Sequence, residues 1–373
     1  MTSAWVSSGL AALTGHPDGP PLDPGHHTAE AAAQWGAALG VNGAALLTER
    51  AALTGRTRAG TISVGGSCRL LETADGWAAL SCARPDDPDL LTALIGAPMS
   101  RRKLAEWCRT RSGAEIRQRA RLLGLAVSLV GEWPHPAPPC APAAVPDLRG
   151  ALVVDFSALW AGPLCAHLLG LAGAQVIKVE TPDRPDGARF GDPRFFDLLH
   201  SGHRSVILDP RHQAAALQSL LERADVVIES SRPRALARWG LDAHAAAAAG
   251  TVWLSITAYG RREDRVGFGD DVAAAAGLVA QDPDGCGPLF CGDALADPLT
   301  GLYAACRVAE SLARGGEVLD VAMAAVAAST VSGYAPARPV SFAPAPQART
   351  IPSVPAPQPG RDTAAVLAEL ATA

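Results

Sequence analysis

The stretch GCGPLFCGDALADPLTGLYAA, residues 285–305, places a single carboxylate, Asp297, among apolar residues where a helix is expected to begin. Asp293 precedes it by four residues, and Pro298 and Gly301 follow it. Removing a carboxylate from water is costly, so this position needs a reason. One reason is structural, since an aspartate before a proline commonly caps a helix. The other is chemical, because a partly desolvated carboxylate at the positive end of a helix can act as a nucleophile.

The charges of the chain limit its partners. It has 32 basic residues, of which only Lys103 and Lys178 are lysines, against 37 acidic ones, for a formal net charge of -5. A bound phosphate would therefore be met mostly by guanidinium groups or by backbone N–H groups. A mildly acidic chain without a basic run is a poor nucleic-acid binder, so no nucleic acid is expected as a partner.

The eight cysteines form no CxxC pair, so neither a zinc site nor a redox motif is indicated, and no metal is expected. The opening MTSAWVSSGL lacks a basic region followed by a long apolar run, which argues against a signal peptide. No apolar stretch reaches the roughly 20 residues that a membrane span needs. We therefore expect a cytoplasmic protein with no membrane partner.

The elements that must position Asp297 begin at residue 151. Short Val/Ile/Leu runs (ALVVDF, QVIKVE, SVILD, DVVIES and TVWLSITAYG) alternate with segments of helical spacing, among them AGPLCAHLLGLAGA, RHQAAALQSLLERA and PRALARWG. This alternation predicts an α/β fold with a parallel, Rossmann-like sheet covered on both faces. The first strand-to-helix turn reads DFSALWAGPLC rather than GxGxxG, which removes the main support for an NAD site.

The N-terminal part has a different pattern. CRLLETADGWAALSC, residues 68–82, predicts a β-hairpin turning at Asp75-Gly76, and residues 101–130 are expected to be helical with exposed arginines. The expected organisation is a small α+β domain over 1–133, a Pro-rich linker over 134–150, a Rossmann-like domain over 151–334, and a Pro-rich arm with a closing helix over 335–373. A weak internal repeat joins SGLAALTGHPDGPPL at the start to AGLVAQDPDGCGPLF at 276–290.

From residue 151 the chain resembles the family III CoA-transferases, which include formyl-CoA transferase, carnitine CoA-transferase and α-methylacyl-CoA racemase. The resemblance is carried by VVDFSALWAGPLCAHLLGLAGAQVIKVETP, GHRSVILD, ADVVIESSRPRALARWGL, GFGDD, ALADPLTGLYAA and the tail PGRDTAAVLAEL. It implies a Rossmann-like large domain with a smaller α+β domain, coenzyme A or an acyl-CoA as substrate, and an intertwined homodimer. It also implies that Asp297, followed four residues later by Gly301, is the nucleophile.

The resemblance further implies residues that bind the acyl-CoA. They are Trp160 near the acyl group, the arginines expected at the phosphates, two acidic residues of GFGDD and a glycine pair matching the family's mobile loop: Arg189, Arg204, Arg238, Asp270, Asp271, Gly65 and Gly66. Exposed arginines on a solvated face, and core packing of Trp160, are the structural alternatives.

Two departures from the family pattern matter. The racemase branch has a histidine before the aspartate of GFGDD, and here that place is taken by Gly269 or Asp270, which disfavours racemisation unless Asp270 or Asp271 is the base. His203 is the histidine best placed to touch a ligand, although an ordinary loop histidine is the simpler interpretation. The small domain also precedes the Rossmann-like part, so residues 1–133 resemble the back half of one family copy and 151–373 the front half of another.

These observations predict transfer of CoA from an acyl-CoA to a small carboxylic acid, with Asp297 as the covalent carboxylate. The aspartate would attack the thioester to give a mixed anhydride, which the CoA thiolate would convert to an aspartyl-CoA thioester. Two alternatives stay open. One is α-proton transfer in a racemase or epimerase, and the other is a non-catalytic acyl-CoA-binding relative of the fold.

Overall fold

The computed structural model describes residues 2–140, 146–230, 236, 238–333 and 335–372. Its largest sheet has six strands, all parallel, in the order β12-β9-β8-β5-β6-β7. The strands are β5 (Leu152–Asp155), β6 (Gln175–Glu180), β7 (Arg204–Ile207), β8 (Val226–Glu229), β9 (Val252–Thr257) and β12 (Val318–Ala322). The predicted α/β class is confirmed, and β12 is a sixth strand that the sequence pattern missed.

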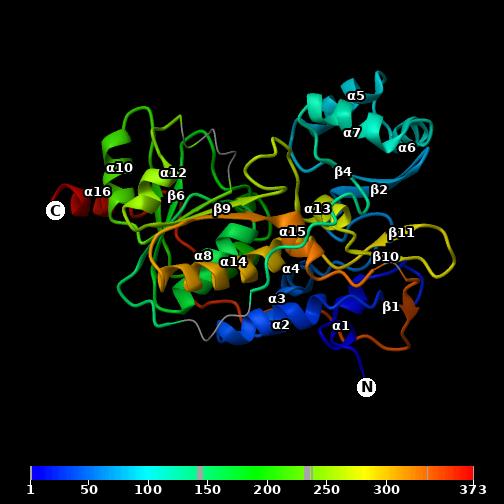
Figure 1. Ribbon diagram of the computed structural model, residues 1–373, viewed down its shortest axis with the longest axis horizontal. Coiled ribbons are helices and arrows are strands. Elements are labelled where there is room, and N and C mark those ends of the chain that lie inside the picture. Colours follow the sequence, from blue (N-terminus) through cyan, green and yellow to red (C-terminus); the bar gives the residue numbers. More distant parts are fainter. Residues whose placement is uncertain (1, 141–145, 231–235, 237, 334, 373) are drawn as a thin grey trace.

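Helices cover both faces of this sheet (Figure 1). Side chains alternate along the strands, so Val153 and Val154 of β5 belong to two separate apolar clusters. One face is covered by α8 (Ala161–Leu171) and α14 (Ala296–Leu312). The other face is covered by α10 (Ala214–Glu222) and α16 (Thr363–Ala371). The remaining elements of this part are α9 (Pro193–His200), α12 (Ala243–Ala248), α13 (Gly269–Ala275), α15 (Met323–Ala328) and the 3₁₀ turn η2 (Gly187–Phe190).

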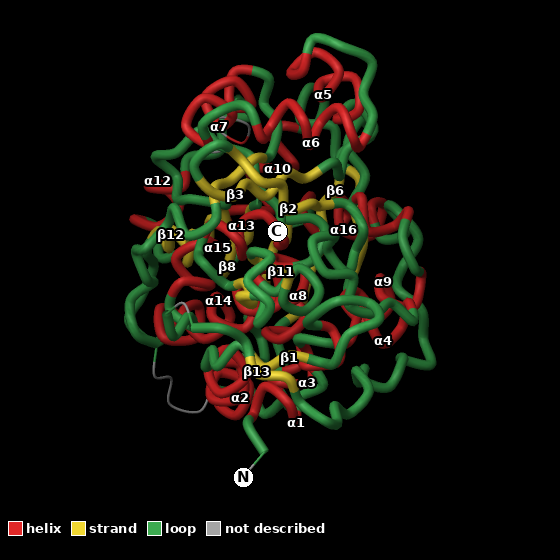
Figure 2. Tube along the Cα trace, turned by 90° about the vertical axis from the view of Figure 1, so that its right-hand side faces the viewer, coloured by secondary structure: helices red, strands yellow, loops and turns green. Residues whose placement is uncertain are grey.

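The small α+β part consists of a three-stranded antiparallel sheet and three helices. The predicted hairpin is confirmed as β2 (Cys68–Thr73) and β3 (Gly76–Ser81), and β4 (Val127–Leu129) pairs with β3. The helices are α5 (Asp87–Ile95), α6 (Arg101–Arg109) and α7 (Gly113–Leu122). Helix was therefore wrong for residues 127–129, where buried Val127 and Ser128 extend the sheet instead. Figure 2 shows this part at the opposite end of the molecule from the N-terminus.

Residues 2–54 pack on the large core, near α14. They form α1 (Ala4–Ser7), η1 (Leu10–Leu13), α2 (Thr28–Ala38), α3 (Gly43–Leu46) and α4 (Glu49–Thr54), and Trp5 and Trp35 are buried in the same cluster as α8 and α14. Two short antiparallel pairs complete the fold: β1 (Leu22–Asp23) with β13 (Arg338–Pro339), and β10 (Val279–Gln281) with β11 (Pro288–Phe290).

The two segments of the suspected repeat lie together, since His16 Nε2 is 2.8 Å from Asp282 Oδ2. Neither this contact nor the packing of the first helices tests the predicted domain boundaries. Half of the expected helix PRALARWG lies outside the described residues, as does part of the Pro-rich linker. Within the described ranges, no helix combines the length and apolar character needed to cross a membrane.

Candidate active site

Asp297 lies in the first turn of α14, and the residue is partly exposed. The residue at the helix cap is Leu295, so Asp297 is not the capping residue that the structural interpretation required. Across the described residues, no hydrogen bond ends on the Asp297 carboxylate. A carboxylate that is neither capping nor paired keeps its oxygen lone pairs available for a reaction.

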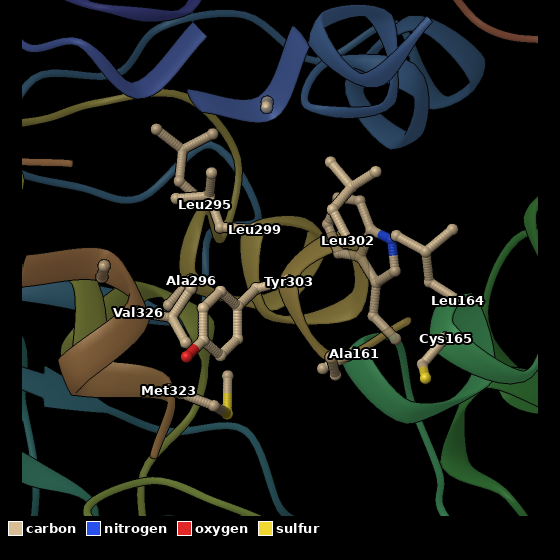
Figure 3. Packing of buried hydrophobic residues seen from close by; sticks show 14 of the residues in the cluster. Ala161, Leu164, Cys165, Leu295, Ala296, Leu299, Leu302, Tyr303, Met323 and Val326 are labelled. Atoms are coloured by element: carbon tan, nitrogen blue, oxygen red, sulfur yellow. The ribbon is translucent and has the colours of Figure 1, made fainter. Parts of the chain in front are cut away.

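Close packing of α14 on α8 fixes where Asp297 sits. A Cβ added at Gly301 would lie 2.9 Å from the Ala161 carbonyl oxygen and 2.9 Å from Leu164 Cβ, so only glycine permits this approach. Figure 3 shows Leu299 and Leu302 of α14 in the same packed layer as Leu164. Because α8 starts just after β5, this packing brings the start of α14 to the carboxyl edge of the sheet.

The N-terminus of a second helix, α13, lies against the Asp297 carboxylate. Gly269 opens α13, and a Cβ there would overlap Asp297 Oδ2 and lie 2.7 Å from the Ala294 carbonyl oxygen. Ala294 itself has a φ of +48°, a left-handed backbone conformation that residues other than glycine rarely adopt. Its N–H donates to Asp270 Oδ1 at 2.9 Å, which ties the segment before α14 to α13.

An arginine from the N-terminal segment supplies positive charge at the site. The Arg50 guanidinium on α4 donates to Asp293 through Nη2 at 2.6 Å and through Nε at 2.8 Å. It also stacks over the Trp160 ring at 4.5 Å from the centroid, and Trp160 packs edge-on against Phe195. Trp160 is 1 % exposed, so it forms part of the wall behind the site rather than an open surface.

Burial and neighbouring negative charges raise the pKa values of Asp270 and Asp297. Desolvation raises the pKa of Asp297 to about 7; Arg50 opposes this rise, and Asp270 and Asp293 add to it. Desolvation likewise raises the pKa of Asp270 to about 6, with Asp293 adding to the rise and Arg50 opposing it. At neutral pH Asp297 is therefore divided between its ionised and protonated forms, as is common for carboxyl groups at functional sites.

Asp271 faces away into a structural network. Its carboxylate accepts from Ser81 Oγ at 2.6 Å, from the Phe268 N–H at 2.9 Å and from Ser128 Oγ at 3.3 Å. Desolvation raises its pKa to about 7 despite these bonds. Since Ser81 and Ser128 belong to β3 and β4, Asp271 joins the small sheet to α13.

The predicted glycine pair lies beside the cluster. A Cβ at Gly65 would be 3.5 Å from Arg50 Nη2, 3.5 Å from Asp293 Oδ1 and 3.6 Å from Arg56 Nη1. Gly66 has a φ of +80°, and its N–H donates to the Ser63 carbonyl at 2.7 Å. The loop between α4 and the small sheet thus reaches the same site as the start of α14.

Comparison with known proteins identifies the fold's relatives. The family model described as CoA-transferase family III matches residues 148–357, more than half of the chain. The chain belongs to this family. Similar proteins include the succinate–glutarate CoA-transferase of Agrobacterium fabrum, 30% identical over 48% of this chain and 51% of that protein. The beta subunit of the succinyl-CoA–L-malate CoA-transferase of Chloroflexus aurantiacus is 35% identical over 47% of this chain and 49% of its own length.

A solved structure of a CaiB/BaiF family protein from Brucella suis is 29% identical, covers 49% of this chain and 55% of that chain, and has a TM-score of 0.46. The chain thus spans about half the length of the curated CoA-transferases that it matches.

Two of the three arginines that the family resemblance assigned to CoA are engaged with acidic partners. Arg189 pairs with Glu180 at 2.5 Å and stacks over Phe196 at 4.3 Å. Arg204 forms two 2.8 Å bonds to Glu369 of α16. The predicted ligand contact of His203 is also unsupported by its position, because the side chain is 4 % exposed.

Arg238 lies instead at a cleft of about 270 Å³ beyond the carboxyl ends of β6 and β7. The other side chains lining this cleft include two further arginines, a threonine and a tryptophan: Arg184, Arg211, Thr181 and Trp239. Arg211 also contacts Asp183 and Asp209, at 3.0 and 2.9 Å. Both aspartates also line the cleft, so Arg184 and Arg238 are the guanidinium groups there that have no ion pair with a described residue.

Sequence reasoning missed Arg50, Arg184 and Arg211. Arg184 and Arg211 follow the predicted strands QVIKVE and SVILD by a few residues, so a count of arginines after parallel strands would have found them. Arg50 had no such signal, because its partner Asp293 is 243 residues away in the chain.

Proposed function

We propose that this chain transfers CoA from an acyl-CoA thioester to a carboxylic acid, with Asp297 as the covalent carboxylate. The observation that carries the proposal is a partly exposed Asp297, without a hydrogen-bond partner among the described residues, at the start of α14. Its pKa of about 7 leaves much of it ionised at neutral pH, and the α14 dipole favours that form. Family membership supports the same chemistry.

The reaction begins when an Asp297 oxygen attacks the thioester carbonyl and the C–S bond breaks, which releases CoA as a thiolate. The thiolate then attacks the aspartyl carbonyl of the mixed anhydride, releases the donor acid and leaves an aspartyl-CoA thioester. The acceptor carboxylate attacks that thioester and again expels the thiolate. Attack of the thiolate on the acceptor's acyl carbon yields the new acyl-CoA and restores Asp297.

We assign the stabilisation of the oxyanions in these steps to the glycine loop. Because the Gly66 N–H is already bonded to Ser63, the Gly65 N–H, which makes no bond within the described ranges, is the donor we assign to this role. Trp160 stacked on Arg50 would close the inner wall of the acyl site.

The cleft with Arg184 and Arg238 is our candidate for the CoA phosphates, because guanidinium forks bind phosphate oxygens in pairs and these two have no ion pair with a described residue. We expect Arg238→Gln to weaken CoA binding about tenfold in a calorimetric titration, the loss of one charge-assisted contact. Arg204→Gln is the control, since Arg204 is already paired with Glu369. Equal weakening of CoA binding by the two substitutions would show that the phosphates bind elsewhere.

We further propose that the protein works as a cytoplasmic homodimer. Light scattering would test its assembly.

The test of the transfer chemistry is to incubate the protein with a panel of acyl-CoAs, trap with hydroxylamine or borohydride, and examine the peptide that contains Asp297. Modification at Asp297 that is absent in Asp297→Asn is the expected result. Exchange of the α-hydrogen in deuterated buffer without modification would instead establish proton transfer, for which Asp270 is the adjacent second acid. Tight CoA binding with neither reaction would make the chain a binding protein.

A further inference from the structure

The first turn of α13 contacts two parts of the molecule through residues that are two positions apart. At Gly269 the backbone comes so close to Asp297 that a Cβ there would overlap Oδ2 of the carboxylate. At Asp271 the side chain reaches the small sheet instead, where it accepts from Ser81 of β3 at 2.6 Å and from Ser128 of β4 at 3.3 Å. Any movement of this turn relative to the small sheet therefore also changes the space beside Asp297.

Asp271 is costly to keep in this place, because the residue is fully buried and its carboxylate is removed from water. A third donor to it is the Phe268 N–H at 2.9 Å, which belongs to the same turn. Ser128 Oγ is also bonded to the Tyr259 hydroxyl at 2.5 Å, and Tyr259 follows β9. The network thus joins three segments at one carboxylate: the small sheet, the first turn of α13 and the carboxyl end of the large sheet.

The other end of α13 is held to the small part by its backbone. The Gly131 N–H, just after β4, donates to the Ala274 carbonyl at 3.0 Å. The Trp133 N–H donates to the Ala275 carbonyl at 2.9 Å. These bonds do not depend on the side chain at the start of the helix. Replacing Asp271 should therefore release the first turn of α13 while the rest of the helix stays attached to the small part.

We propose that Asp271 is a positioning residue for the reaction at Asp297, because it fixes the first turn of α13 between the small sheet and the reacting carboxylate. This inference rests on the proposed function, since it adds a residue to the machinery of the same site. In this role Asp271 does not touch the reacting atoms but sets the separation between Gly269 and the Asp297 carboxylate. A displacement of about 1 Å at a reacting group can cost about 100-fold in rate, so the effect should appear in the rate rather than in binding.

The test compares Asp271→Ala with Asp271→Asn. Both replacements remove the charge of Asp271, which adds to the rise in the pKa of Asp297, so this electrostatic effect is common to the two. Asparagine can still accept from Ser81 and Phe268 and can donate to Ser128, whereas alanine offers these groups no partner. We expect trapping of Asp297 at saturating acyl-CoA to be about 100-fold slower in Asp271→Ala and at most about threefold slower in Asp271→Asn. The acyl-CoA concentration that gives half the maximal rate should stay within about twofold of the parent in both.

Asp87→Ala is the matched control for loosening of the small part. Asp87 is also fully buried, and its carboxylate accepts from the Arg84 guanidinium at 2.6 Å and from the Ala83 N–H at 2.9 Å. It begins α5, which packs on the other face of the small sheet from α13 (Figure 1). Its loss breaks a buried ion pair and should lower the free energy of unfolding, yet leave the trapping rate within about twofold of the parent.

Ser81→Ala keeps the test decisive if Asp271→Ala does not fold. It removes one of three donors to the Asp271 carboxylate and should slow trapping about tenfold. Equal rates in the alanine and asparagine variants of Asp271 would overturn the inference. The same holds if Asp87→Ala slows trapping as much as Asp271→Ala, or if the loss lies in the half-saturating concentration and not in the maximal rate.

A second measurement separates this inference from the proposed function, because it needs no transfer of CoA. The infrared carboxyl band of Asp297 is titrated in both Asp271 variants, each by difference against its own Asp297→Asn form. A released first turn admits water to Asp297, so the midpoint should be about one pH unit lower in Asp271→Ala than in Asp271→Asn. Coinciding midpoints would overturn the inference even where CoA transfer at Asp297 is established. Separated midpoints support it even if no acyl-CoA modifies Asp297.

Discussion

Replacing Arg50 with methionine removes the positive charge that Asp293 contacts twice, while it keeps an apolar stem against Trp160. The Asp293 side chain is fully buried and 24% of the Arg50 side chain is exposed. Removing one partner of a buried ion pair costs about 3–5 kcal/mol, because the other charge is left in the interior. We expect about 3 kcal/mol here, the lower end of that range, since water reaches part of Arg50.

The same substitution changes the ionisation of Asp297. Burial already raises the pKa of Asp297 to about 7, and Arg50 is the charge that opposes a further rise. Without Arg50 the carboxylate should need a pH about one to two units higher to ionise. Because only the ionised form attacks a thioester, the rate of modification should fall below about pH 8–9 in the variant, rather than below about pH 7 as in the parent.

A matched control separates this electrostatic effect from general destabilisation. Arg349 binds Glu49 through two bonds, at 2.8 and 2.9 Å, with side-chain exposures of 22% and 0%. Arg349→Met should therefore cost a similar free energy of unfolding but leave the acid limb of the Asp297 reaction near pH 7.

Two measurements are needed. The first is the rate of trapping of Asp297 by acyl-CoA and hydroxylamine as a function of pH, and the second is an infrared difference titration of the carboxyl band between each protein and its Asp297→Asn form. The second does not depend on turnover. If the midpoint in Arg50→Met coincides with that in Arg349→Met, then Arg50 does not control the ionisation of Asp297 and the electrostatic reasoning is wrong.

Three further predictions concern the glycines and a buried histidine. Gly269→Ala should reduce modification of Asp297 at least 100-fold because the new Cβ overlaps the carboxylate, whereas Gly76→Ala, where a Cβ meets open space, should react like the parent. Gly301→Val should cost about 1–3 kcal/mol in urea unfolding, since its side chain would press α14 off α8; an unchanged midpoint would contradict that packing. Burial lowers the pKa of His203 to about 3. Below about pH 6.5 the unfolded chain therefore binds a proton at this histidine that the folded chain does not bind, so the free energy of unfolding decreases as the pH falls from 6.5 toward 3. Between pH 7 and 5 the parent should thus lose about 2 kcal/mol more than His203→Phe, and parallel urea curves for the two proteins would count against a neutral buried imidazole.

The sequence by itself determined the class of the fold and singled out Asp297 as the candidate reactive carboxylate. Uninterrupted runs such as QVIKVE predicted buried parallel strands because a strand covered on both faces is apolar at every position. The residues around Asp297 predicted that a helix begins there, as the match of Asp297 and Gly301 to the family pattern also implied, and the structure has Asp297 in the first turn of α14. These are local patterns, so they can be read without knowing which distant segments meet.

Only the tertiary structure decided what surrounds that carboxylate and which arginines have a free guanidinium. Arg50 meets Asp293 across 243 residues, and Arg204 is engaged by Glu369 across 165 residues. An arginine has the same side chain whether it faces a phosphate cleft or an internal glutamate, so its role depends on the acid that folding brings beside it. The pKa of Asp297 likewise depends on burial and on neighbouring charges from α4 and α13, which come together only when the chain is packed.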